Sequence, residues 1–165
     1  MLRQTTHTQK PKKRLGAAAV EMAMVLPLFM TITFGSIEIG HALNVSQKLE
    51  AIVRDGGRLA SKDISATLLA GGVTANQKVT NDIKNMLKAE GYNTTNVVVS
   101  ITYADGATVG QNFDLSLAAN QYKLMKLRVT IPYSDVGIFP MKISSAAIMD
   151  ATLVTSKGRS TMTTN

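Results

Sequence analysis

The apolar residues of this 165-residue chain gather first in one long run near the N-terminus. From Leu15 to Ile37 the only charged side chain is Glu21. As a helix this run would extend about 34 Å, which is enough to cross a hydrocarbon core of about 30 Å. The pattern therefore predicts a transmembrane helix over residues 17–40, in which Pro27 leaves room for a local kink.

The pattern then changes to that of an amphipathic helix. Beyond the predicted transmembrane span, apolar residues recur with helical spacing and form one stripe. The stripe consists of Val45, Leu49, Ile52 and Val53. Gly56-Gly57 follows, and we favour tight packing or helix termination over a flexing point for this pair. The helix is therefore expected to continue outside the bilayer and to bury one face.

A second amphipathic helix is predicted after a turn at residues 68–72. Thr74 and Gln77 have the spacing of a capping box, and Gly91 is a suitable stop signal. The apolar face of this helix would consist of Val79, Ile83, Met86 and Leu87.

From residue 96 the apolar residues alternate, which is typical of half-buried strands. We expect strands over residues 97–103 and 126–131 and a final strand over residues 147–153. Asp105-Gly106 is a hairpin signal, so residues 108–115 are interpreted as a weaker returning strand. Residues 157–165 are interpreted as a polar tail. The expected fold class is α+β, with a small antiparallel sheet packed on the long helix.

Charge adds an orientation to this picture. Most of the net charge of +7 resides in one short tail, on Arg3, Lys10, Lys12, Lys13 and Arg14. By the positive-inside rule, the basic segment of residues 1–16 is expected in the cytoplasm, and residues 41–156 are expected to form a domain outside it. Because the remaining charge is nearly balanced and aromatic residues are few, a nucleic-acid partner is not expected.

Glu21 needs an explanation, because a carboxylate in a membrane helix costs roughly 2.5–3.5 kcal/mol. Four small or apolar residues, beginning with Ala17, separate Glu21 from Gly16. Gly16 lies at the junction of the basic segment and the apolar run. This arrangement resembles the cleavage site of type IV prepilins.

Residues 16–62 also resemble the TadE-like pseudopilins of the tight-adherence (Tad, or Flp) pilus system. The elements that carry the resemblance are Gly-Ala-Ala-Ala-Val-Glu, Val-Leu-Pro-Leu, Phe-Gly-x-Ile-Glu-x-Gly and Arg-Asp-Gly-Gly-Arg. Met22 stands where the related major pilins usually carry tyrosine, which favours a minor subunit.

The resemblance implies that a prepilin peptidase cuts between Gly16 and Ala17. Glu21 would then set the register between subunits by neutralising the new amino group of a neighbour. The implied partners are the prepilin peptidase, other pseudopilins, the major pilin, an inner-membrane assembly platform and membrane lipid. The protein would reside in a bacterial inner membrane and contribute to pilus assembly.

Two other interpretations stay open at this stage. The chain would be an uncleaved, anchored binding domain if its leader remained attached. It would be a secreted enzyme if signal peptidase cut after Ala42, at the small-x-small sequence that Gly40 begins.

Other chemistry finds little support in the sequence. No cysteine is present, and His7 and His41 are far apart. Four aspartates are considered as metal ligands, namely Asp105, Asp114, Asp135 and Asp150. Their spacing fits turn formation better than a metal site. Lys126 and Arg128 are interpreted as solvated strand surface, with contact to a partner pilin left open. No catalytic residue, metal or cofactor is predicted.

Overall fold

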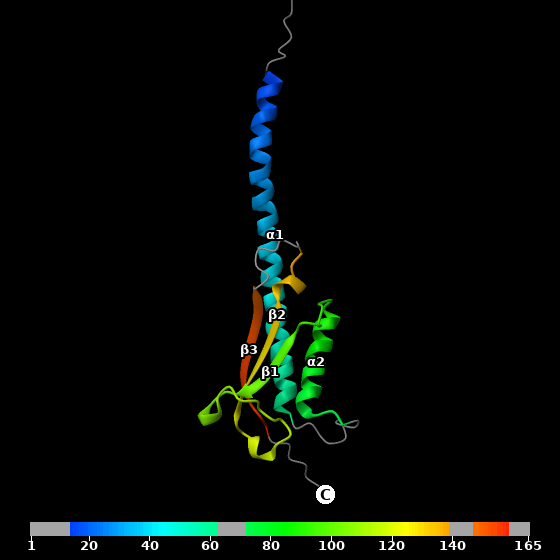
Figure 1. Cartoon of the computed structure of the whole chain (residues 1–165), viewed down its shortest axis with the longest axis vertical. Coiled ribbons are helices and arrows are strands. Elements are labelled where there is room, and N and C mark those ends of the chain that lie inside the picture. The colour runs from blue at the N-terminus through cyan, green and yellow to red at the C-terminus, as the bar shows by residue number, and fades with distance from the viewer. Residues whose placement is uncertain (1–13, 63–71, 139–146, 159–165) are drawn as a thin grey trace, which may run out of the picture. The chain divides into compact units, whose positions relative to one another are not determined.

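The computed structural model describes residues 14–62, 72–138 and 147–158. Its helices are α1 (Arg14–Ser61) and α2 (Ala75–Ala89), and its strands are β1 (Val98–Tyr103), β2 (Leu124–Pro132) and β3 (Ile148–Ser156) (Figure 1). These helices and strands form the α+β fold that the sequence predicts. The chain divides into two compact units, residues 1–39 and residues 40–165.

The sheet has the strand order β1-β2-β3, and both pairs are antiparallel. Leu127, at its centre, pairs with Ile101 on one side and Leu153 on the other. The alternation in sequence places one set of side chains on the core face, where Leu127, Val129 and Ile131 of β2 are fully buried. The three predicted strands at residues 97–103, 126–131 and 147–153 are thus confirmed.

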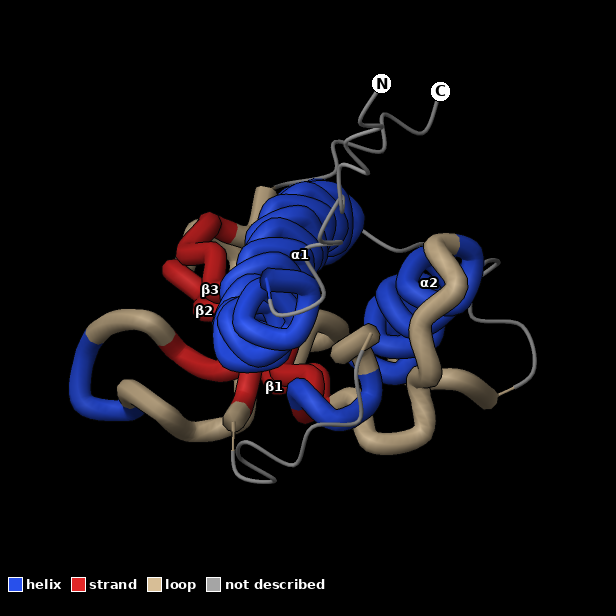
Figure 2. Tube along the Cα trace, turned by 90° about the horizontal axis from the view of Figure 1, so that it is seen from above, coloured by secondary structure: helices blue, strands red, loops and turns tan. Residues whose placement is uncertain are grey.

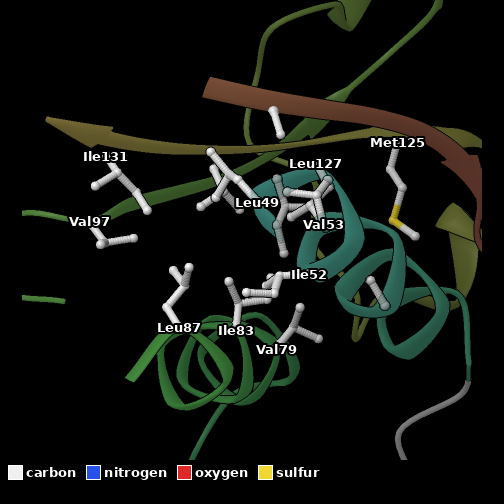
Figure 3. Packing of buried hydrophobic residues seen from close by; sticks show 14 of the residues in the cluster. Leu49, Ile52, Val53, Val79, Ile83, Leu87, Val97, Met125, Leu127 and Ile131 are labelled. Carbon is white, nitrogen blue, oxygen red and sulfur yellow. The ribbon is translucent and has the colours of Figure 1, made fainter. Parts of the chain in front are cut away.

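The core of the second unit is formed by α1 beyond residue 40, by α2 and by one face of the sheet. All four residues of the predicted stripe on α1 are buried. Their partners on α2 are Val79, Ile83 and Leu87, and Figure 3 shows these side chains pointing toward α1. Figures 2 and 3 place the strands and α2 on different sides of α1. The outer part of α1 is therefore the middle layer of this unit.

Gly56 and Gly57 permit this close packing. A Cβ atom on Gly56 would lie 2.7 Å from Ile83 Cγ1 on α2 and 3.4 Å from Leu127 Cδ2 on β2. A Cβ atom on Gly57 would overlap the side chain of Leu153 on β3. The expectation of tight packing is confirmed, whereas termination at this pair is wrong because α1 continues to Ser61.

We predict that Gly56→Val lowers the free energy of unfolding by about 2–3 kcal/mol, because the added methyl groups overpack a layer with no spare room. Gly40→Val is the matched control, since Gly40 lies in the same helix and nothing lies within 4 Å of its Cβ position. Chemical denaturation of the full chain in a nonionic detergent measures both changes. Equal stability of the two variants would contradict the packing role of Gly56.

The ends of α2 agree with the sequence. Thr74 Oγ1 accepts a hydrogen bond from Gln77 N at 3.2 Å, and Gln77 Oε1 accepts one from Thr74 N at 3.0 Å, which completes the predicted capping box. The helix ends before Gly91, whose φ of +89° lies in the left-handed region. Lys48 of α1 donates to Glu90 at 2.7 Å, and this hydrogen bond raises the pKa of the Lys48 ammonium above its ordinary value.

The predicted returning strand at residues 108–115 is wrong. Asp105-Gly106 does not begin a two-residue hairpin, because residues 106–108 form a 3-10 turn and only an isolated bridge pairs Thr102 with Asn112. The strand that pairs with β1 is β2, which follows the long loop of residues 104–123.

A few backbone hydrogen bonds join this loop to β1, among them Phe113 N to Ile101 O at 3.0 Å, and side chains supply further bonds. Asn76 of α2 donates from Nδ2 to Phe113 O at 2.6 Å and accepts from Leu115 N at 2.9 Å. Phe113 and Leu115 are buried, so their backbone groups need partners inside the protein. A single amide thus supplies two of the bonds that a neighbouring strand would otherwise provide.

Lys157 also differs from the expectation of a polar tail. It is buried, its ammonium donates to Leu115 O, and its backbone bonds with Lys123 and Tyr122. This residue therefore closes the loop onto the end of β3. The remainder of the predicted tail, residues 159–165, and most of the predicted turn at 68–72 lie outside the described residues.

Candidate functional site: the first helix and the predicted processing motif

The first unit is an apolar helix whose side chains have no core to cover them. Its exposed large hydrophobic residues occur on every side of the helix, and are Val20, Met22, Met24, Val25, Leu26, Leu28, Phe29, Met30, Ile32, Phe34, Ile37 and Ile39. By length and composition, α1 is able to cross a membrane. A helix that is apolar all round needs lipid or other helices around it.

The hydroxyl groups within this apolar segment bond to the helix itself. Thr31 donates to the Pro27 carbonyl, Thr33 to the Phe29 carbonyl, and Ser36 to the Ile32 carbonyl, each at 2.8 Å. These bonds to the preceding turn remove the cost of a bare hydroxyl in an apolar medium. Pro27 lies inside α1 and does not end it.

Gly16, Ala17 and Glu21 all lie on α1, and all three are exposed. Ala17 and Glu21 are four residues apart, so they occupy the same face of the helix at an axial separation of about 6 Å. The Glu21 carboxylate makes no hydrogen bond or ion pair with any described residue. Nothing lies within 4 Å of the Cβ position of Gly16. The motif is thus presented on an uncovered helix face.

His41 connects α1 to the loop after β2. Its Nε2 lies 2.7 Å from the carbonyl oxygen of Val136, a buried residue at the end of a 3-10 turn. Sequence reasoning identified His41 only as an isolated histidine, because its partner is 95 residues away. The contact gives His41 a structural role where the second unit begins.

The four aspartates considered as ligands do not come together. Asp114 accepts from Ser116 N at 2.8 Å, Asp135 accepts from Asn96 at 3.0 Å, and Asp150 pairs with Arg128 at 3.0 Å. Within residues 14–62, 72–138 and 147–158 there is no group of three or more His, Asp or Glu residues able to hold a metal ion. These three carboxylates stabilise turns and surface contacts, whereas Asp105 precedes the 3-10 turn of residues 106–108 without a side-chain capping bond.

A buried polar cluster in the second unit escaped sequence reasoning. Asn120 is fully buried; its Oδ1 accepts from the Tyr103 hydroxyl at 2.8 Å and its Nδ2 donates to Asp114 O at 2.9 Å. The Tyr103 ring packs against Phe113 with ring centroids 4.8 Å apart. The cluster joins the long loop to β1, and its satisfied hydrogen bonds mark it as structural.

Comparison with known proteins bears on the first helix. Residues 16–58 match the family model described as TadE-like protein. The matched segment contains Gly16, Ala17 and Glu21 and continues through Gly56-Gly57, which confirms the resemblance seen in the sequence. No curated protein and no solved structure matches the chain significantly.

Proposed function

We propose that this TadE-like chain is a minor, pilin-like subunit that a prepilin peptidase processes and that the Tad pilus requires for assembly. The observation that carries the proposal is the family match over residues 16–58, which includes the predicted cut site and the acidic residue that follows it. The exposed apolar side chains of the first unit support it, because such a helix needs lipid before assembly and other subunits afterwards.

Cleavage between Gly16 and Ala17 would change the electrostatics of the helix. The basic leader holds the precursor in the inner membrane, with the second unit outside the cytoplasm. Removing the leader leaves a positive amino group at Ala17, close to the Glu21 carboxylate in an otherwise uncharged segment. Assembly then requires both charges to be neutralised in a medium of low dielectric constant.

Pairing between subunits supplies that neutralisation. In a staggered bundle, Glu21 of one subunit meets the Ala17 ammonium of its neighbour, and packing in any other register leaves both groups unpaired. A buried ion pair adds little net stability, but breaking one costs about 3–5 kcal/mol. Glu21 therefore selects the alignment, while apolar packing provides the attraction.

The partners in this proposal are the peptidase, the other pseudopilins, the major pilin and the inner-membrane assembly platform. The chain itself is assigned no catalytic role, because the residues that cut the precursor belong to the peptidase. Gly16 and Ala17 act as substrate residues.

Mass spectrometry of the amino terminus of the protein purified from its native membrane tests the proposal. We expect the mature chain to begin at Ala17. A chain that retains the leader indicates an anchored domain, and one that begins at Leu43 indicates secretion; either result refutes processing after Gly16. Gly16→Val provides the control, since a bulky residue before the cut should leave the precursor intact.

A further inference from the structure

The outer face of the sheet carries a compact group of donors that the core does not use. On β2, Lys126 and Arg128 alternate with buried residues and both are exposed. The register places Thr102 of β1 opposite Lys126, and Ser100 opposite Arg128. Directly paired residues have Cβ atoms about 5 Å apart, so two cations and two hydroxyl groups form a small square on one face.

This square lines a hollow rather than a flat surface. The hollow has a volume of about 260 Å³ and is bounded on one side by Val109 and Gly110. Gly110, with a φ of +83°, donates from its backbone to Tyr103 O at 3.1 Å, and Tyr103 N donates to Gln111 O at 2.9 Å. The bounding segment is therefore fixed to the edge of β1.

The charges around the hollow leave one positive charge to be balanced. Arg128 Nε donates to Asp150 Oδ2 on β3 at 3.0 Å, which orients the guanidinium group and neutralises one charge. Lys126 makes no ion pair with any residue that the structure describes. One incoming carboxylate would balance this charge, whereas a phosphate would exceed it.

We propose that Lys126, Arg128, Ser100 and Thr102 form a binding site for a carboxylate, supplied by an acidic segment of a partner polypeptide. The ammonium and the remaining guanidinium nitrogens contact the carboxylate oxygens, and the two hydroxyl groups donate to them. The carboxylate of Asp150, already bound to Arg128, shows the kind of ligand that this face accepts. The site is independent of processing at Gly16.

Fluorescence anisotropy of a labelled hexaglutamate peptide with the full chain in a nonionic detergent tests the site. Lys126→Gln with Arg128→Gln should weaken binding by about tenfold or more, since both cations are lost. The matched control is Lys84→Gln with Lys88→Gln on α2, which changes the net charge equally and should alter binding by less than about twofold. Lys126→Gln alone tests the site without disturbing the Arg128–Asp150 pair.

Two further comparisons separate a built site from general attraction between charges. Ser100→Ala with Thr102→Val keeps the charge and should weaken binding by about threefold, because donors are lost. Acetate should compete with the peptide at concentrations where inorganic phosphate does not. The proposal is overturned if the paired Lys126 and Arg128 variant binds normally, if the α2 control loses as much, or if phosphate competes better than acetate.

Discussion

If Glu21 pairs with a neighbouring subunit as proposed, Glu21→Gln is expected to reduce the number of pili roughly 100-fold at equal amounts of cleaved protein. Glutamine keeps the size of the side chain and removes its charge, so the Ala17 ammonium of a neighbouring subunit has no counter-ion. Removing one member of a buried ion pair leaves the other unpaired, which costs about 3–5 kcal/mol. A change of about 1.4 kcal/mol corresponds to a factor of ten.

Counting pili by electron microscopy, together with mass spectrometry of the amino terminus, measures this effect separately from cleavage. Glu50→Gln is the matched control, because Glu50 is an exposed glutamate of the same helix α1 in the second unit. Normal pili on cells with Glu21→Gln would remove the role of charge pairing. Loss of pili with Glu50→Gln as well would point to a general defect of the helix.

Leu127→Ala should lower the free energy of unfolding of the second unit by about 2–5 kcal/mol. Leu127 is fully buried at the centre of the sheet, and its side chain faces the Gly56 position of α1. The truncation leaves a cavity that the close helix–sheet contact cannot fill by collapse.

The matched control for this change is Leu124→Ala on the same strand. Leu124 is 39% exposed, so its truncation should cost less than about 1 kcal/mol. Urea denaturation of the full chain in a nonionic detergent, followed by circular dichroism, compares the two variants. Similar losses at both positions would mean that the sheet centre is not the main site of burial.

Local patterns predicted most of the fold, because burial in this chain follows simple periods. The stripe that begins at Val45 has helical spacing, and the residues around Leu127 alternate, so each pattern identifies its element and the buried face. The capping box at Thr74 was readable because its two side chains are three residues apart.

The errors arose where distant side chains supply the hydrogen bonds. Phe113 and Leu115 alternate like strand residues, yet Asn76 bonds to their backbone groups across 37 and 39 residues. Lys157 looks like part of a polar tail, but its ammonium bonds to a carbonyl 42 residues away. No local rule relates such residues, and they differ from a strand or a tail only in tertiary structure.

The motif at Gly16 and Glu21 was recognised from sequence because its signal is spacing plus position, between a basic leader and an apolar run. The square of donors on the outer face of the sheet, formed by Lys126, Arg128, Ser100 and Thr102, was not recognised from sequence. It depends on the register between β1 and β2. Lys126 and Arg128 were recognised as a surface pair, but the hydroxyl groups opposite them became visible only with the strand pairing.

The length of α1 has a mechanical consequence, because the helix that carries the predicted processing motif also provides Leu49 and Val53 to the core of the second unit. On the proposed function, a pull applied to the N-terminal end of α1 acts on a helix that continues to Ser61, past the buried residues Leu49 and Val53. A subunit drawn out of the bilayer by its helix would therefore bring its folded domain with it.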